Sequence, residues 1–566
     1  MGAEGAHEGH REEIRYRVRV PGSEGDTMEN IEIAKIFYEI SEILKLKGED
    51  FKSRAYFNAA RRIERIDELR EFYEKNELEK IPGIGKNLAK KIIEYFETGK
   101  ISYLEKIKKE LPEGIEELLK IPGVGPKTAL FLYRELRIKS LEDLERAIES
   151  HEIRRVKTEK LERNLERGLK ILKTGKKRIL LSEAFKIVEK LSGIIKNFEV
   201  AGSFRRRKET IGDLDIILTE IEPNSLRDFQ ILAKGEKKIT AIYKNIHIDF
   251  RIVKKEEYGA SLQYFTGSKE HNIRLRRIAQ KKGYKLNEYG LFEGNRRVAI
   301  TEEDIYKKLG MPWIPPELRE NMGEIEAAMK NRLPEIVDLR DIKGDLHIHT
   351  KWSDGLDSIE NVVKKAKELN YEYIAITDHS PTVPAGNGLS EEKLLKQWDI
   401  LESYDNVLKG VECDILKNGA LAYEDRVLEK ADFVIASVHM FVPKTETILK
   451  AMENENVDAI GHPTGRFIGV TDGYDLDMEK IFEKATETNT ALEINAYPKR
   501  LDLKDIYIRK AKEYGAKFVI GTDSHNVEEM DNFIFGVYNA RRGWAEKKDI
   551  LNCLDLKELK RYVYSL

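Results

Sequence analysis

The sequence has very little cysteine, since only Cys413 and Cys553 occur among 566 residues. Two thiols cannot build a disulfide framework or a thiolate zinc site, so we expect the protein in the reducing cytoplasm. Long hydrophobic runs are also missing: no segment approaches the roughly 18 consecutive apolar residues of a membrane-spanning helix, and no signal-peptide core follows Met1. These absences argue against disulfide-rich secreted proteins and against a membrane partner.

Aromatic residues are few, at 8%, whereas charged residues reach 35% and hydrophobic residues 41%. This composition is typical of folded soluble domains and excludes a chain that is disordered throughout. At roughly 100–200 residues per domain, the length predicts several domains. The abundance of Lys, Arg and Glu hints at a thermophilic source.

The small net charge of −2 conceals two parts of opposite sign. Residues 1–342 contain 69 Lys and Arg against 61 Asp and Glu, whereas residues 343–566 contain 30 against 40. A basic first part suits a polyanion such as nucleic acid, and an acidic second part suits bound cations. Ordinary solvated surface is the alternative interpretation.

Hydrophobic periodicity changes character along the chain. Residues 1–27 have no periodicity and are expected to be a disordered extension, with Met28 as a possible true start. The chain is nearly all helical from 31 to 174, and short β-rich runs occupy 179–300. From residue 343 onward strand and helix alternate seven times, which predicts parallel strands in a βα-type barrel with chemistry at the strands' C-terminal ends.

One short motif occurs twice in the helical part, as IPGIGKNLAKKI at 81–92 and IPGVGPKTALFL at 121–132. Each copy places Gly-x-Gly in a tight turn before a helix, where backbone amides can approach a phosphate closely. The motif resembles the helix-hairpin-helix, which grips the DNA backbone without reading bases. One copy could be a simple helix-turn-helix corner, but two copies, each followed by lysine, favour DNA binding. The expected DNA-binding residues are Gly83, Gly85, Lys86, Gly123, Gly125 and Lys127.

The segment GSFRRRKETIGDLDI at 202–216 combines phosphate donors with carboxylates. Asp213 and Asp215 are two residues apart on an expected strand and so face the same side, and Asp249 lies on another expected strand. Three such carboxylates can hold two Mg²⁺ ions, which activate a hydroxyl and neutralise a leaving pyrophosphate. The Gly-Ser turn and arginines 205–207 supply donors for a triphosphate. A solvated strand edge is the alternative for an isolated Asp-x-Asp, and the upstream turn argues against it.

Six of the 11 histidines lie after residue 342, each at the C-terminal end of an expected strand. With three carboxylates they make nine nitrogen and oxygen ligands, enough for two or three Zn²⁺, Mn²⁺ or similar divalent ions. Such a cluster turns water into hydroxide and stabilises both oxygens of a phosphoester displacement. The nine expected ligands are His347, His349, Asp354, His379, Glu412, His439, His462, Asp523 and His525.

Several motifs together resemble known families. GSFRR, GDLD, IDFR and YFTGS (264–268) resemble the family X DNA polymerases, whereas HIHTKWSDG, TDH, GVE, SVH, GHP and GTDSH resemble the polymerase-and-histidinol-phosphatase (PHP) domain. Bacterial and archaeal family X polymerases join these parts in the same order, so the resemblance covers about residues 28–566. It implies a helical 8-kDa-like domain with the first hairpin motif (28–105), a second hairpin domain (106–174), a palm (175–260), a nascent-base-pair-binding domain (261–317), a linker (318–342) and a PHP domain (343–566).

The resemblance also implies roles for single residues. Asp213, Asp215 and Asp249 become the catalytic metal carboxylates of the palm, and Lys91 falls at the Schiff-base lysine of a deoxyribose-phosphate lyase. Two positions differ from animal relatives, which carry an arginine in place of His247 and an acidic residue in place of Lys269. Asn87 stands where a neighbouring lysine is expected, so Lys91 could equally be a phosphate-binding lysine. The expected substrate contacts are Arg178, Gly202, Ser203, Arg206 and Gly212 at the triphosphate, Tyr264, Phe265 and Gly267 at the sugar, and Asn272 and Arg276 at the base and template.

The sequence thus predicts a multidomain α+β and α/β protein, with helical hairpin domains, a nucleotidyltransferase-type palm and a distorted (β/α)7 barrel. The expected function is a monomeric repair polymerase that fills gapped or primed DNA with deoxynucleoside triphosphates. The resemblance implies 3′→5′ exonuclease, 3′-phosphatase and apurinic-site endonuclease activities for the barrel. Template-independent nucleotidyl transfer, a small-molecule phosphatase and a non-catalytic DNA-binding scaffold are the alternatives. Dependence of nucleotide addition on a template separates the leading prediction from template-independent transfer. Dependence of the activity on the hairpin motifs separates it from a small-molecule phosphatase.

Overall fold

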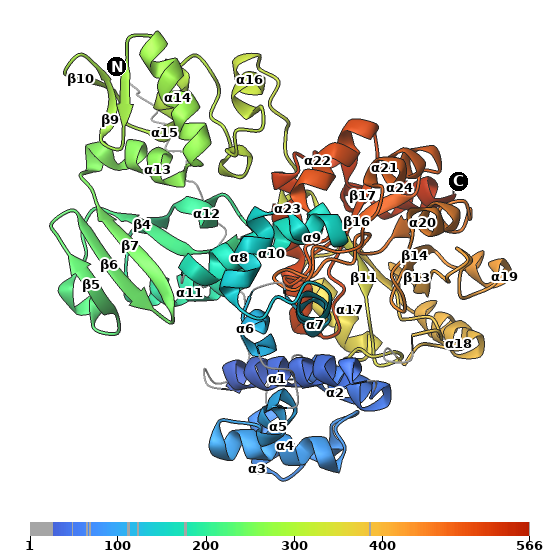
Figure 1. Ribbon diagram of the computed structural model, residues 1–566. Coiled ribbons are helices and arrows are strands. Elements are labelled where there is room, and N and C mark those ends of the chain that lie inside the picture. Colours follow the sequence, from blue (N-terminus) through green and yellow to red (C-terminus); the bar gives the residue numbers. More distant parts are fainter. Residues whose placement is uncertain are drawn as a thin grey trace. The chain divides into compact units, whose positions relative to one another are not determined.

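The computed structural model describes residues 26–47, 49–63, 66, 69–109, 114–121, 124–174, 178–383 and 387–564. The extension predicted at 1–27 lies almost wholly outside these residues. The chain forms two compact units, residues 1–107 and 108–566 (Figure 1). Among the described helices, none is long and apolar enough to cross a membrane.

The first unit is built from helices around one apolar core. On the first helix Ile33, Phe37, Ile40 and Leu44 are fully buried and recur every three or four residues, which places them on one face. Phe37 packs edge-on against Tyr56 of the second helix, with ring centroids 5.2 Å apart. The helices are α1 (Asp26–Leu46), α2 (Asp50–Ile63), α3 (Leu69–Glu74), α4 (Lys86–Thr98) and α5 (Ser102–Lys109).

The second hairpin region is a small helical bundle with its own core. Leu118, Leu132, Leu144 and Leu165 are buried together in this cluster. Ser140 caps one of the helices, because its side chain accepts a hydrogen bond from the Asp143 amide. The helices are α6 (Ile115–Leu119), α7 (Pro126–Glu135), α8 (Leu141–Glu149), α9 (Glu152–Val156) and α10 (Glu159–Thr174).

The palm is a five-stranded sheet in the order β2-β4-β7-β6-β5, in which only β4 and β7 run parallel to each other. Helix α11 packs its buried Leu181, Ala184 and Leu191 into the apolar cluster of this sheet. The elements are β1 (Ile179–Leu180), α11 (Leu181–Ile194), β2 (Phe198–Val200), α12 (Gly202–Arg205), β3 (Thr210–Ile211), β4 (Asp213–Leu218), β5 (Gln230–Lys234), β6 (Lys238–Tyr243) and β7 (Ile246–Ile252).

The region after the palm packs three short antiparallel strands and four helices around one cluster. The segment expected to be a linker at 318–342 contributes Leu318, Ile325 and Ala328 to this cluster. Its helix has only six residues, too few to show a helical period in the sequence. The elements are α13 (Tyr258–Thr266), α14 (Lys269–Lys281), β8 (Lys285–Asn287), β9 (Gly290–Glu293), β10 (Arg296–Ala299), α15 (Glu302–Lys308) and α16 (Glu324–Met329).

The C-terminal region is the predicted seven-stranded parallel barrel, with strands in sequence order from β11 to β17. A bridge between Ile348 and Ser524 brings the first and last strands together. The strands are β11 (Gly344–Ile348), β12 (Tyr373–Ile376), β13 (Val407–Asp414), β14 (Phe433–Ser437), β15 (Ala459–Ile460), β16 (Ala491–Asn495) and β17 (Phe518–Gly521).

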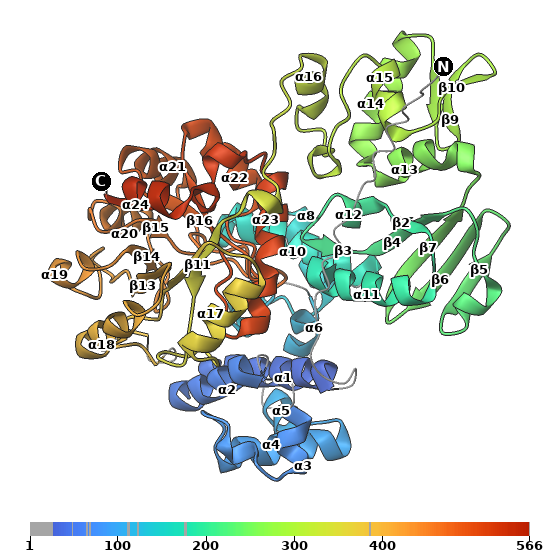
Figure 2. The ribbon, with the colours of Figure 1, turned by 180° about the vertical axis from the view of Figure 1, so that it is seen from behind.

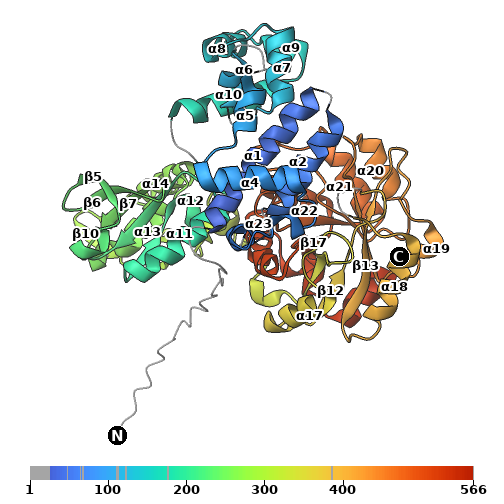
Figure 3. The same ribbon diagram turned by 90° about the horizontal axis from the view of Figure 1, so that it is seen from below.

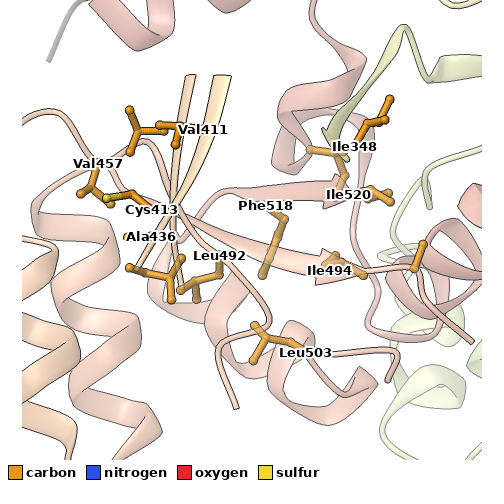
Figure 4. Close-up of a cluster of buried hydrophobic side chains, with 14 of the residues drawn as sticks. Ile348, Val411, Cys413, Ala436, Val457, Leu492, Ile494, Leu503, Phe518 and Ile520 are labelled. Atoms are coloured by element: carbon orange, nitrogen blue, oxygen red, sulfur yellow. The ribbon is translucent and has the colours of Figure 1, made fainter. Parts of the chain in front are cut away.

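Helices α17, α18 and α20 lie outside the barrel strands (Figure 3). Their apolar faces share one large cluster with residues of the strands, including Val411, Ile494 and Phe518 (Figure 4). The helices are α17 (Ile359–Glu368), α18 (Glu391–Leu401), α19 (Asp425–Leu428), α20 (Thr445–Ala451), α21 (Met478–Glu487), α22 (Asp505–Tyr514), α23 (Phe533–Arg542) and α24 (Leu556–Tyr564).

Palm and barrel share apolar contacts. Helix α23 lies between the barrel strands and the palm in the two opposite views of Figures 1 and 2. Its Phe535, together with Leu501 of the barrel, is buried within the hydrophobic cluster of the palm. The ring of Phe185 on α11 packs edge-on against Phe535 at 5.7 Å.

Candidate active sites

The three palm carboxylates come from two neighbouring parallel strands. Asp213 and Asp215 lie on β4, and Asp249 lies on β7 directly opposite Asp215 in the strand register. Burial and the nearby Asp213 raise the pKa of Asp215 to about 6. A cation bound between these groups would favour the charged form of Asp215, so the donor set fits divalent metal ions.

Basic side chains already contact this acidic group. Asp249 Oδ2 lies 2.8 Å from Lys238 Nζ and 3.1 Å from Arg251 Nη2, and Asp249 Oδ1 accepts a hydrogen bond from Thr240 at 2.6 Å. Burial alone would raise the pKa of Asp249, but Lys238, Thr240 and Arg251 hold it below its ordinary value. Lys238 was missed in the sequence because only the pairing of β6 with β7 brings it beside Asp249.

Two glycines let other site residues approach the carboxylates and each other. Gly202 has φ +64, and a Cβ there would lie 3.0 Å from Asp215 Oδ2. At Gly212 a Cβ would lie 3.0 Å from Arg178 Nη1, so the lack of a side chain makes room for this guanidinium. Ser203 is half-buried in the first turn of α12. The structure therefore brings the predicted triphosphate residues to the same end of the palm sheet.

The three consecutive arginines have different partners in the protein. Arg205 forms a double hydrogen bond with the buried Glu302, at 2.9 and 3.0 Å. The Arg207 guanidinium lies 4.5 Å from the ring centroid of Tyr538. Arg206 donates to Glu320 at 3.0 Å and to the carbonyl oxygen of Thr266. Each of the three arginines thus has a partner in a distant segment that the sequence does not reveal, and contact of Arg206 with a triphosphate stays a prediction.

The predicted sugar and base residues lie at the end of α13, in the turn after it and on α14. The rings of Tyr264 and Phe265 are 5.2 Å apart, and Arg251 lies 4.4 Å from the Phe265 ring. Asn272 donates to the Tyr264 carbonyl oxygen at 2.6 Å, and the Arg276 guanidinium lies 6.0 Å from the Tyr264 ring. A Cβ at Gly267 would lie 3.2 Å from Arg206 Nη1.

The described residues of the two hairpin motifs share a backbone hydrogen bond and a helix cap. The Ile84 amide donates to the Ile81 oxygen at 3.0 Å, and the Val124 amide donates to the Ile121 oxygen at the same distance. Gly85 and Gly125 cap the following helices α4 and α7 with nearly equal dihedral angles. A Cβ at Gly83 or Gly85 would meet no atom within 4 Å, and Lys86 is exposed. Gly123 and the Lys127 side chain lie outside the described residues.

Lys91 lies on α4 beside two stacked tyrosines. Its Nζ is 4.9 Å from the ring centroid of Tyr103 and 5.8 Å from that of Tyr56, and it donates to the Asn87 oxygen at 3.2 Å. Burial lowers the pKa of Lys91, although Glu94 acts in the opposite direction. A lower pKa increases the fraction of neutral amine.

The six barrel histidines converge at the C-terminal ends of the strands, as the sequence predicts. Their nitrogen atoms and nearby carboxylate oxygens form three groups able to hold an ion. Glu412 belongs to two of the groups: its Oε1 lies 3.0 Å from His462 and 3.3 Å from His439, and its Oε2 lies 2.8 Å from His379. The groups are His349, Asp354, His379 and His525; His347, His349 and Glu412; and His379, Glu412 and His439.

Unsatisfied polar atoms support a metal centre here. Among the described residues, His347 Nε2, both ring nitrogens of His349 and of His379, and Glu412 Oε2 are buried without a partner in hydrogen-bond geometry, although His379 Nδ1 lies 2.8 Å from Glu412 Oε2. Burial, His525 and His379 hold the pKa of His349 well below its ordinary value, so its ring is neutral and offers a lone pair. Buried polar groups rarely stay unpaired, so these atoms fit divalent cations.

The sequence analysis missed the carboxylates that orient these ligands. Glu493 Oε1 lies 2.6 Å from His347 Nδ1, and Asp414 Oδ1 lies 2.8 Å from His439 Nδ1. Each carboxylate contacts Nδ1 of its histidine and leaves Nε2 directed toward the cluster. Metal-binding histidines are usually oriented in this way, by a hydrogen bond from the second ring nitrogen. Their position at the ends of the expected strands LEIN and VECD was the available signal.

Comparisons with known proteins agree with this architecture. Residues 28–101 match the family described as helix-hairpin-helix domain, and 115–165 match the SAM-like helix-hairpin-helix tandem. Residues 261–320 match the DNA polymerase beta thumb, and 345–496 match the PHP domain.

Individual relatives point the same way. The chain is 38% identical to the Bacillus subtilis (strain 168) protein named DNA polymerase/3′-5′ exonuclease PolX, over 95% of this chain and 99% of that protein. It is 30% identical to DNA polymerase lambda of Arabidopsis thaliana, over 51% of this chain and 62% of the relative. A protein named probable phosphatase from Caldanaerobacter subterraneus is 32% identical over 33% of this chain and 78% of its own length. The chain therefore belongs to the family X DNA polymerases that carry a C-terminal PHP domain.

Proposed function

We propose that this protein fills short gaps in DNA during repair and that its barrel hydrolyses phosphoesters at DNA 3′ ends. The observation that carries the proposal is the presence of two complete ligand sets in one chain, the palm carboxylates on β4 and β7 and the histidine cluster at the barrel strand ends. The proposal includes a 3′→5′ exonuclease, with 3′-phosphatase and apurinic-site endonuclease as further reactions of the same centre.

In the palm, side chains orient the incoming nucleotide. Ser203, Arg206 and Arg178 would donate to the triphosphate, and Tyr264 with Phe265 would pack against the sugar. Divalent cations, Mg²⁺ in this proposal, would be held by Asp213, Asp215 and Asp249 and would neutralise the leaving pyrophosphate. Thr240 fixes one oxygen of Asp249, so the carboxylate keeps its orientation without the ion. Asn272 and Arg276 would contact the base and the template.

In the barrel, the nine ligands would hold two or three ions such as Zn²⁺ or Mn²⁺, which supply a hydroxide nucleophile. Glu493 and Asp414 hold the rings of His347 and His439 in place. The hairpin turns would grip the DNA backbone on gapped or primed duplex, with the chain acting as a monomer.

Lys91 is proposed as a lyase nucleophile on 5′-deoxyribose-phosphate ends. Its lowered pKa favours the neutral amine that attacks a sugar aldehyde. If this is its role, borohydride should trap the protein on such an end, and Lys91→Ala should abolish the adduct. Trapping that persists in Lys91→Ala would leave Lys91 as a phosphate-binding residue.

The two-centre proposal is tested on a gapped duplex, with and without nucleotides, using one variant of each centre. Asp249→Ala should lose nucleotide addition and keep 3′-end hydrolysis, whereas His349→Ala should show the reverse. Equal loss of both activities in either folded variant would contradict two independent centres. Nucleotide addition that does not depend on the template would instead support template-independent transfer.

A further inference from the structure

A short palm segment, residues 205–209, contacts the barrel through two of its side chains, Arg207 and Glu209. Arg207 lies with its guanidinium 4.5 Å from the ring centroid of Tyr538 on α23. Glu209 forms an ion pair of 2.6 Å with Arg466, which is 5% exposed. The segment directly follows α12 and precedes β4, so its position influences both the phosphate-binding turn and the palm carboxylates.

Arg542, the last residue of α23, reaches the palm from the barrel side. Its Nε and Nη2 donate to Asp505 Oδ2 at 3.0 and 2.6 Å, which anchors the side chain on α22. Its Nη1 donates to the carbonyl oxygen of Arg206 at 2.7 Å and to Glu320 Oε1 at 3.1 Å. The Arg542 side chain is 5% exposed, so these bonds are shielded from solvent.

Glu320 connects the two arginines. Its Oε1 accepts from Arg542 Nη1 and also from Arg206 Nε at 3.0 Å. Arg206 Nη1 donates to the Thr266 oxygen, whereas Nη2 donates to none of the described residues. Two nitrogens of the Arg206 guanidinium are thus fixed, and the third keeps its hydrogens for another acceptor.

We infer that Arg542 of the barrel is a positioning residue for nucleotide binding in the palm. It holds Arg206 by two routes, the backbone carbonyl and the Glu320 carboxylate, so that Nη2 is directed at the triphosphate. Because a guanidinium binds phosphate best in one fixed orientation, this arrangement lowers the entropy lost on binding. The inference rests on the proposed role of Arg206 at the triphosphate.

The neighbouring Arg541 provides a matched control. It lies on the same helix and also crosses to the region before the barrel, where it donates to Glu317 and to the Val337 oxygen at 2.8 Å each. Among the described residues, it forms no hydrogen bond or ion pair with residues 205–209. A general weakening of the contact between regions should therefore affect Arg541→Met and Arg542→Met alike.

The experiment measures kcat and KM for deoxynucleotides on a gapped duplex, with exonuclease rates on the same preparations. Arg542→Met should raise KM roughly tenfold, the equivalent of one charge-assisted hydrogen bond, with a smaller change in kcat and with exonuclease retained. Arg541→Met should leave KM unchanged. The double variant of Arg206→Met with Arg542→Met should be no worse than Arg206→Met alone, because Arg542 acts through Arg206.

Several results would overturn the inference, and they do so in different ways. If Arg206→Met leaves KM unchanged, the proposed triphosphate role of Arg206 fails and the inference fails with it. If Arg206→Met raises KM but Arg542→Met behaves like Arg541→Met, or adds fully to Arg206→Met, only the positioning role fails. If Arg542→Met does not fold, Glu320→Gln replaces it, because this change removes the charge that connects Arg542 to Arg206. Glu320→Gln must then give the same rise in KM. An unchanged KM in that variant overturns the inference.

Discussion

Glu412 lies at the centre of the barrel cluster because its two carboxylate oxygens face different histidines. Oε1 faces His439 and His462, and Oε2 faces His379. A carboxylate can span two ions, whereas an imidazole offers one free nitrogen toward them. Loss of this residue is therefore expected to disturb more than one ion.

Glu412→Ala should lower the metal content by more than one ion per chain. Exonuclease should fall by more than about 100-fold, since even the outer partners of metal ligands typically account for 10–100-fold. Elemental analysis and 3′-end hydrolysis rates measure this, with the exposed Glu429→Ala as control. Polymerisation in magnesium should persist. A variant that keeps its full complement of ions would show that Glu412 does not bridge.

A second residue-scale prediction concerns Asp458, which precedes β15. Burial raises its pKa to about 8, although the Val434 amide donates to it at 2.7 Å. The folded state therefore holds a proton that the unfolded state releases near pH 4, and stability falls as pH rises between about 4 and 8. Asp458→Asn should remove this loss. Its free energy of unfolding should exceed that of the wild type more at pH 8 than at pH 5, measured by denaturant titration, and an equal gap at both pH values would contradict the assignment.

At the scale of elements, the role of a hairpin turn in DNA binding can be distinguished experimentally from the effect of backbone strain at a helix end. Gly83 and Gly99 both have positive φ, at +84 and +70, and a Cβ at either meets no atom within 4 Å. They flank opposite ends of α4, so Gly83→Val and Gly99→Val introduce the same kind of backbone strain. Only Gly83→Val should weaken DNA binding, by roughly tenfold if one phosphate contact is lost.

Titration of fluorescent gapped DNA at several salt concentrations measures this effect. The wild type should show a steep loss of affinity with salt and little sequence preference, because hairpin amides and lysines contact phosphates. Equal weakening in the two glycine variants would assign the effect to strain rather than to DNA contact. A shallow salt dependence in the wild type would argue against the hairpin assignment.

Local patterns were sufficient to predict the elements that repeat or alternate. The seven barrel strands and the histidines at their ends follow from alternation, and Asp213 with Asp215 follows from the period of a strand. Contacts between distant segments were not predictable: Glu302 beside Arg205 and Tyr538 beside Arg207 depend on tertiary packing. Lys238 also required the strand register, and the six-residue α16 was too short to show a period.

At the scale of the whole molecule, palm and barrel should unfold together. Phe535 of α23 is 7% exposed and packs in the palm cluster, so Phe535→Ala should cost about 3 kcal/mol. Both activities should then be lost together, at a lower temperature than in the wild type. Calorimetry with activity assays after heating measures this, and Phe482→Ala, within the barrel's own cluster, is the control. Unchanged thermal inactivation of the polymerase in Phe535→Ala would contradict a shared core.

The burial of Phe535 and Leu501 among palm residues also determines how such a chain can be shortened. A cut between the two regions would leave Phe185 and its apolar neighbours facing water, and an exposed patch of this kind promotes aggregation. A working polymerase without the barrel therefore needs polar substitutions on α11 at the same time as the truncation. The boundary visible in the sequence near residue 343 separates two chemistries. A truncation there still exposes apolar residues, which must be replaced by polar ones.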